Sequence, residues 1–168
     1  SLVTIDLETY YHPSERVLFD MADLLDEGLV LKEKTFRQFV KEHGWEQYRD
    51  KSVAIHCSTD AVVPTWAYML LCTVLEPHTH MVIFGNLEDL EIALYRKAFA
   101  SLDPETFNEA KVVIKGCSHR SIPMAIYVEL VRILRPVVSS IMYGEPCSTV
   151  PVYKAQNVAR RPQRSRDQ

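Results

Sequence analysis

From residue 52 onward, short apolar runs alternate with longer amphipathic segments. The apolar runs cover residues 52–57, 81–84, 111–117 and 139–143. Between them, residues 64–75, 87–101 and 123–134 carry apolar side chains at helical spacing. Helices of this length between short apolar strands are typical of βαβ units in a parallel sheet. The pattern therefore predicts a three-layer α/β fold whose mainly parallel sheet is built from a βαβαβαβ core over residues 52–154.

The first 51 residues follow a less regular pattern. Residues 3–7 alternate like a strand, and residues 16–19 are a second candidate strand. A short helical turn is expected over 21–25, and a helix over 32–43 that stops at Gly44. We therefore expect residues 1–51 to form a small mixed subregion of one α/β domain that ends near residue 154.

Charge is distributed unevenly between the body of the chain and its C-terminal tail. The formal net charge is −3, but residues 155–168 carry +3, which leaves −6 for the rest. The tail's basic residues are Arg160, Arg161, Arg164 and Arg166. Because the tail has no apolar anchor, we expect it to be disordered and solvated rather than bound to RNA or lipid. An acidic body also argues against a nucleic acid partner, whose binding requires neutralised phosphates.

Composition places the 168-residue chain among single-domain proteins. Hydrophobic residues make up 47% of the chain, enough for one core, yet no window approaches 18 uninterrupted apolar residues. The sequence as given shows no secretion signal, and its four cysteines show no close pairing. We therefore expect reduced thiols, a cytoplasmic location and no membrane partner, and the sequence is compatible with a protein partner.

Three cysteines stand at the ends of predicted strands. Right-handed crossovers would align the carboxyl ends of the core strands along one rim, where open α/β sheets build their sites. Cys57, Cys117 and Cys147 would all lie on that rim. Cys72 lies within an apolar helix, so we expect it to be a buried hydrophobic side chain.

The rim cysteines predict a thiolate metal site as the favoured hypothesis. Thiolates select zinc or iron, including iron–sulfur clusters, and His56 or His119 could complete the ligand set. The nearby supporting residues are Asp60, Glu145 and Ser148. The cysteines are 60 and then 30 residues apart, which matches no local metal motif. The prediction therefore depends on the strands sharing one sheet.

Two other readings of the cysteines stay open. A nucleophilic Cys57 in a transferase or hydrolase would need a base, and His119 suits this role better than His56, because neighbouring strand residues point to opposite faces. Alternatively, the chain is a non-catalytic interaction or scaffold protein with idle cysteines. A tyrosine-phosphatase loop is excluded, since Val63 stands where arginine is needed and Asp60 would repel phosphate.

Other motifs carry weaker signals. His78 and His80 precede a strand at the rim opposite the cysteines, so a solvated turn is expected there. No glycine-rich nucleotide-binding motif follows any strand. The segment 145–151 holds two prolines, which either fix a structural crossing over the sheet or preorganise Cys147 beside Ser148 and Thr149.

At these segments the sequence resembles a family of uncharacterised bacterial proteins known only as a domain of unknown function. The resemblance covers residues 4–154 and is most specific at residues 30–37, 56–69, 115–117 and 140–153. All three rim cysteines fall in these segments, whereas His119 lies in a variable stretch. The resemblance implies no defined activity. It implies a genomic setting of sulfur mobilisation and iron–sulfur cluster assembly, where an accessory protein with a thiolate site would fit.

Overall fold

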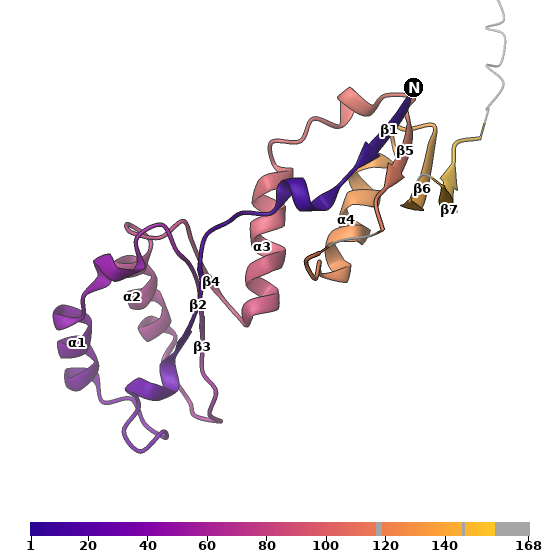
Figure 1. Cartoon of the computed structure of the whole chain (residues 1–168). Helices are drawn as coiled ribbons and strands as arrows, with labels where there is room; N and C mark the ends of the chain where they lie inside the picture. The colour runs from indigo at the N-terminus through magenta and orange to yellow at the C-terminus, as the bar shows by residue number, and fades with distance from the viewer. Residues whose placement is uncertain (117–118, 146, 157–168) are drawn as a thin grey trace, which may run out of the picture. The chain divides into compact units, whose positions relative to one another are not determined.

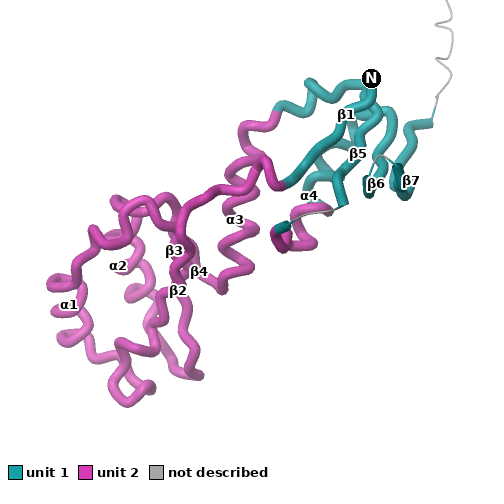
Figure 2. The backbone as a smooth tube through the Cα atoms, in the orientation of Figure 1, with its two compact units in different colours: residues 1–7, 103–119, 128–168 teal, residues 8–102, 120–127 magenta. Residues whose placement is uncertain are grey.

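The computed structural model describes residues 1–116, 119–145 and 147–156. Their strands form two separate sheets, one of order β2-β3-β4 and one of order β1-β5-β6-β7. The chain divides into two compact units around these sheets (Figure 2). Unit 1 comprises residues 1–7, 103–119 and 128–168, and unit 2 comprises residues 8–102 and 120–127.

Unit 2 is built from three parallel strands and three helices (Figure 1). In chain order these are β2 (Arg16–Asp20), α1 (Glu33–Glu42), β3 (Ser52–His56), α2 (Thr65–Leu75), β4 (Met81–Phe84) and α3 (Leu87–Phe99). Single 3-10 turns stand at Met21–Leu24 and Trp45–Tyr48, and another, Leu7–Tyr10, contains the chain boundary between unit 1 and unit 2. The bounds lie within a few residues of those predicted from the pattern.

The β2-β3-β4 sheet is the middle of three layers. Val53 and Ile55 of β3 pack in one hydrophobic cluster with Phe36 of α1 and Leu71 of α2. Ala54, between them, belongs to a second cluster with residues of α3. Successive strand residues point to opposite faces, so α1 and α2 cover one face and α3 covers the other. This confirms the three-layer α/β arrangement within unit 2.

Helix starts in unit 2 follow local sequence chemistry. Asn86 and Asp89 form a reciprocal capping box at the start of α3, with both hydrogen bonds at 2.9 Å. Pro64 occupies the N-cap position of α2, and no side chain caps that helix. Thr59 and Asp60, the polar residues upstream that could cap a helix, are therefore not its caps. Both residues lie in the loop 57–64, several positions before the first turn of α2 at Thr65.

Unit 1 contains the four-stranded sheet. Its strands are β1 (Leu2–Ile5), β5 (Lys111–Ile114), β6 (Ser140–Glu145) and β7 (Ser148–Lys154), preceded at β5 by a 3-10 turn at Pro104–Phe107. The first three are parallel, while β7 returns antiparallel to β6 as a hairpin. Helix α4 (Met124–Leu134) leads into β6, and the boundary between the units falls within it.

The structure confirms an α/β chain with mainly parallel strands. The prediction that the core strands share one sheet, with their carboxyl ends on one rim, is wrong. We expected four consecutive strands in one sheet, whereas β3 and β4 belong to one sheet and β5 and β6 to another. The physical reason lies in the first 51 residues. Strand β2 pairs with β3, and β1 pairs with β5, so β5 has a partner other than β4. The basic tail from residue 157 lies outside the described residues.

Candidate functional site

The carboxyl ends of β2, β3 and β4 meet at one edge of the unit 2 sheet. Because the strands are parallel, this is the edge where α/β folds place their sites. Asp20 and His56 are register partners at the last paired position of β2 and β3. Oδ2 of Asp20 lies 3.9 Å from Nε2 of His56, which is buried and has no hydrogen-bond partner among the described residues. The edge therefore brings a carboxylate and an imidazole together.

Asp20 fixes the loop that follows β3. Its Oδ1 accepts hydrogen bonds from the backbone N–H groups of Ala22 and Ser58, each at 3.0 Å. Burial alone would raise the pKa of Asp20, but the hydrogen bonds from Ser58 and Ala22, with the charge of His56, lower it overall. Asp20 is therefore ionised, and it anchors the backbone at Ser58, the residue that follows Cys57.

Cys57 lies between His56 and Ser58 at this edge and is partly buried. Its Sγ lies 3.5 Å from the carbonyl oxygen of Thr59 and 3.4 Å from the Thr59 hydroxyl. The hydroxyl of Tyr68, on α2, also interacts with the thiol. Burial raises the pKa of Tyr68, and its contact with Cys57 and the charge of Asp20 raise it further. Tyr68 therefore remains a protonated donor at neutral pH.

The ring of Tyr68 has an aromatic neighbour that is open to solvent. Phe84, the last residue of β4, packs edge-on against Tyr68 with ring centroids 5.1 Å apart. Its side chain is 69% exposed. An exposed large apolar side chain that packs on Tyr68 offers a contact surface for an incoming apolar group.

The other predicted site residues do not join this edge as one described group. Asp60 is exposed in unit 2, near Cys57 in sequence. His119 and Cys147 are exposed and belong to unit 1, where Ser148 begins β7 as the register partner of Glu145. Cys117 lies outside the described residues, although the N–H of Gly116 donates to the carbonyl of Gly144 at 3.3 Å. The backbone segments that lead to Cys117 and to Cys147 therefore run side by side.

The predicted metal site gains no support from the described residues. Within 1–116, 119–145 and 147–156, no group of three histidine, cysteine or acidic side chains is placed to hold a metal ion. The neighbours of the Cys57 sulfur are hydroxyl and carbonyl groups instead. Zinc or iron at Cys57, Cys117 and Cys147 stays a prediction.

Cys72 is exposed on α2, so its expected burial is wrong. The buried face of this helix is formed by Ala67, Leu71 and Leu75, which recur every four residues. Cys72 follows Leu71 by one position and is therefore rotated about 100° away from the core. The continuous apolar character of the helix concealed which face is buried.

Sequence reasoning missed Asp20 and Tyr68. Asp20 directly follows a candidate strand, which is the one signal that could have marked it. His80, treated as part of a solvated turn, stacks on His12 with ring centroids 3.6 Å apart. Burial lowers the pKa values of both histidines, and the charges of Arg16 and Lys97 lower them further. This pair lies at the amino end of β4, away from Cys57.

Comparison with known proteins gives a family but no activity. A family model described as "Protein of unknown function (DUF2480)" matches residues 1–155. The chain belongs to the DUF2480 family. No curated protein and no solved structure matches it. The expected membership in an uncharacterised family is confirmed, and the match covers both units of this DUF2480 chain. Among the residues that the structure describes, no helix has the length and apolar character needed to cross a bilayer.

Proposed function

We propose that the chain acts through Cys57 as a nucleophilic thiol in cysteine-dependent group transfer or hydrolysis. The observation that supports this most is the Thr59 hydroxyl 3.4 Å from the Cys57 sulfur, with the Tyr68 hydroxyl as a second interacting group. Hydroxyl donors stabilise a thiolate, which is the reactive form of cysteine. They are not zinc or iron ligands of the kind expected at a thiolate metal site, so they favour a nucleophile over a metal ligand.

The surrounding residues position the thiol. Asp20 holds the N–H of Ser58, one residue after Cys57, and faces His56, one residue before it. The loop that carries the nucleophile is thereby fixed on both sides. We assign Asp20 and His56 as positioning residues. We assign thiolate stabilisation to the hydroxyl groups of Tyr68 and Thr59, whereas the Thr59 carbonyl accepts a hydrogen bond from the neutral thiol. A reduced cytoplasmic setting, expected from the sequence, would keep the thiol available.

Competitive alkylation tests the proposal with controls built into the chain. Limiting iodoacetamide at pH 7 is added to the native protein, and modification of each cysteine peptide is followed by mass spectrometry. Cys72 and Cys147 are exposed and serve as reference thiols. We expect Cys57 to react about tenfold faster than either, although it is the more buried thiol, since reactivity follows thiolate content.

Two outcomes would contradict the proposal. Equal, slow alkylation of Cys57 and the two reference thiols would support a non-catalytic scaffold instead. Stoichiometric zinc or iron in the anaerobically purified protein, lost in the Cys57→Ser variant, would support the metal site predicted from the sequence.

A further inference from the structure

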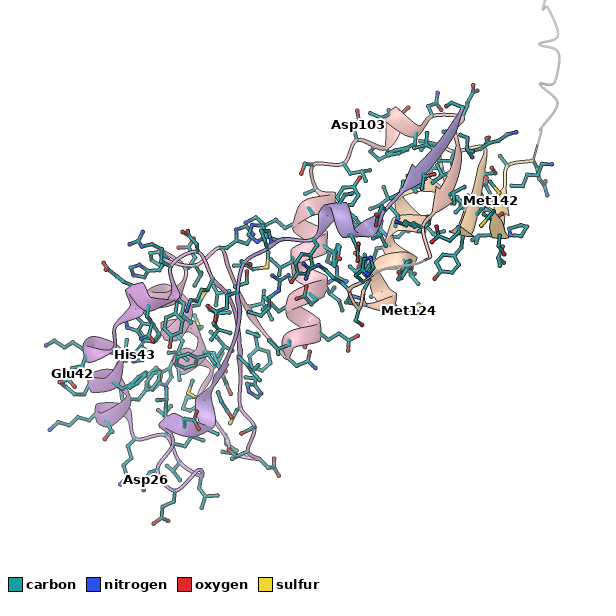
Figure 3. All side chains as sticks on the ribbon, in the orientation of Figure 1. Asp26, Glu42, His43, Asp103, Met124 and Met142 are labelled. Carbon is teal, nitrogen blue, oxygen red and sulfur yellow. The ribbon has the colours of Figure 1, made fainter. Side chains whose placement is uncertain are left out.

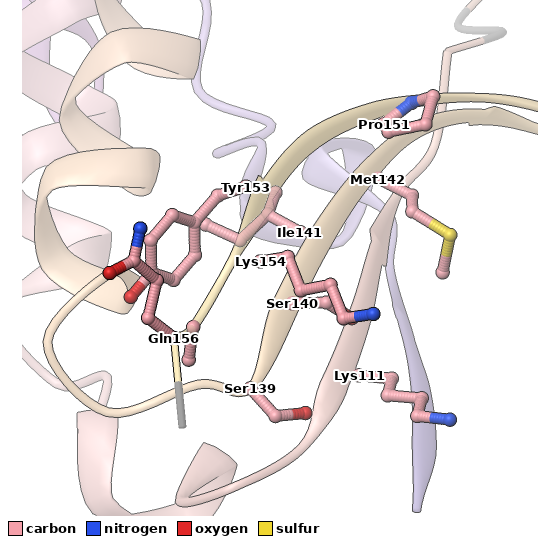
Figure 4. Close-up of a pocket in the computed structure, with 10 residues that line it drawn as sticks. Lys111, Ser139, Ser140, Ile141, Met142, Pro151, Tyr153, Lys154 and Gln156 are labelled. Carbon is pink, nitrogen blue, oxygen red and sulfur yellow. The ribbon is translucent and has the colours of Figure 1, made fainter. Parts of the chain in front are cut away.

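One face of the unit 1 sheet carries a row of polar residues. Lys111 of β5 is the register partner of Ser140 of β6, which in turn is the partner of Lys154 of β7. Register partners on neighbouring strands point to the same face of a sheet. Lys111 and Lys154 therefore extend to the same side, one strand away from Ser140 in each direction (Figure 4). With strands about 4.8 Å apart, the two lysine Cα atoms are separated by about 10 Å.

An apolar row lies next to this polar row. Met142 and Pro151 are also register partners, two residues further along β6, and they line the same groove as the lysines. The groove measures about 770 Å³. Pockets for small molecules span about 300–1,000 Å³, so the groove is of a suitable size for one.

The opposite face of the sheet is occupied by other side chains. Tyr153, which also lines the groove, neighbours Lys154 on β7, and its ring is directed away from the two lysines in Figure 4. The guanidinium of Arg135 lies 5.1 Å from the centroid of this ring. Arg135 directly follows α4. The row of Lys111, Ser140 and Lys154 is thus on the face of the sheet away from this contact.

The groove has positive charge without a compensating acid. None of its lining residues is aspartate or glutamate, and neither Lys111 nor Lys154 has an ion pair within the described part of the chain. Lys115, directly after β5, is paired with Asp6 at 3.5 Å. The Ser139 hydroxyl donates a hydrogen bond to the carbonyl of Ala110 at 3.0 Å. The Ser140 hydroxyl is therefore the side-chain donor that lies between the two lysines in the sheet.

We propose that this groove binds a small organic anion with an apolar body. A carboxylate or phosphate head would lie between Lys111 and Lys154 and accept a hydrogen bond from Ser140. The apolar body would lie on Met142 and Pro151. This site is separate from the proposed role of Cys57, since all of its residues belong to unit 1 and Cys57 belongs to unit 2.

Titrations with octanoate and octyl phosphate, followed by two-dimensional amide NMR on the full chain, test the proposal. We expect saturable shifts in the amide signals of residues 139–142 and 152–154, stronger for one head group than for the other. The Lys111→Gln/Lys154→Gln double variant should bind about tenfold more weakly, because two charge-assisted contacts are lost. Lys115→Gln, directly after the same strand, is the matched control and should bind as wild type does. Both lysines are exposed, so an unchanged spectrum will show that the double variant is folded.

Three results would overturn the proposal. The first is unchanged octanoate and octyl phosphate binding in the double variant. The second is equal binding of octanol, which has the apolar body without the charge. The third is binding to anionic phospholipid vesicles with no response to either soluble anion, which would make this face a membrane-binding surface.

Discussion

The Tyr68 hydroxyl, on α2, interacts with the thiol of Cys57, directly after β3. Eleven positions separate the two residues in the chain, and the turn from strand to helix brings them together at the carboxyl edge of the sheet. Because burial keeps Tyr68 protonated, its hydroxyl can donate to the sulfur. This pair distinguishes Cys57 from the two exposed cysteines of the described chain.

The charges beside Cys57 predict selectivity among thiol reagents. Asp20 is held ionised by its hydrogen bonds, and Asp60 is exposed three residues after the thiol. We expect a cationic methanethiosulfonate reagent to modify Cys57 a few-fold faster than its anionic counterpart at low salt, since nearby carboxylates attract cations. The measurement is the ratio of the two rate constants for each cysteine.

The Asp20→Asn variant supplies the control for this charge effect. The amide removes the charge and keeps an oxygen that can accept the hydrogen bonds of Ala22 and Ser58. The rate ratio should fall toward one for Cys57 and stay constant for Cys72. An unchanged ratio at Cys57 would show that Asp20 does not influence the thiol.

Removing the Asp20 carboxylate altogether should destabilise unit 2. Asp20→Ala leaves the N–H groups of Ala22 and Ser58 without their acceptor. We expect the free energy of unfolding to fall by about 0.5–2 kcal/mol, as for the loss of a helix cap. Urea denaturation measures it, with Asp23→Ala, an exposed acid in the same 3-10 turn, as the matched control. Equal stability of the Asp20 and Asp23 variants would contradict the anchoring role.

Acidification should destabilise the fold through His43. Burial lowers the pKa of His43 below its usual 6.5, and its Nε2 lies 2.8 Å from the Tyr48 hydroxyl. Below pH 6.5, His43 takes up a proton in the unfolded chain but resists protonation in the folded chain. The stability that a neutral His43 provides above that pH is therefore lost as the pH falls toward the pKa of His43 in the folded state. His12 and His80 have lowered pKa values and act in the same direction. His43 lies beside α1 in Figure 3.

Unfolding free energies measured between pH 7.5 and 5 check this prediction. We expect stability to decrease steadily across that range in the wild type. The decrease should be shallower in His43→Gln, which cannot be protonated but retains a polar side chain. A wild-type profile that is flat, or that rises toward pH 5, would contradict the burial of a neutral His43.

The sequence predicts the elements well because their signals are local. The apolar run of β3 and the capping residues of α3 are readable within a few positions. The pairing partner of a strand cannot be recognised from nearby residues. Strand β1 pairs with β5, more than 100 residues away, and β2 pairs with β3 on the side opposite β4. For this reason the prediction that all four strands end at one sheet edge was wrong. The argument for one site built from all three cysteines depended on that shared edge.

Strand β7 and the residues Asp20 and Tyr68 were missed for related reasons. Pro151 argues against a strand, yet β7 is an edge strand, where a proline is tolerated. Asp20 and Tyr68 become neighbours of Cys57 only after β2 pairs with β3 and α2 packs on the sheet. Cys57 itself could be selected from sequence because it ends an apolar run.

The alkylation rate of Cys57 in Tyr68→Phe tests the central claim most directly. Phenylalanine keeps the ring that packs against Phe84 and removes only the hydroxyl. At pH 7, iodoacetamide should modify Cys57 about three- to tenfold more slowly than in wild type, since one thiolate donor is lost. Cys72 in the same sample, and Cys57 in a Tyr153→Phe control, should react at wild-type rates. An unchanged or faster rate at Cys57 in Tyr68→Phe would contradict a thiol activated by this contact.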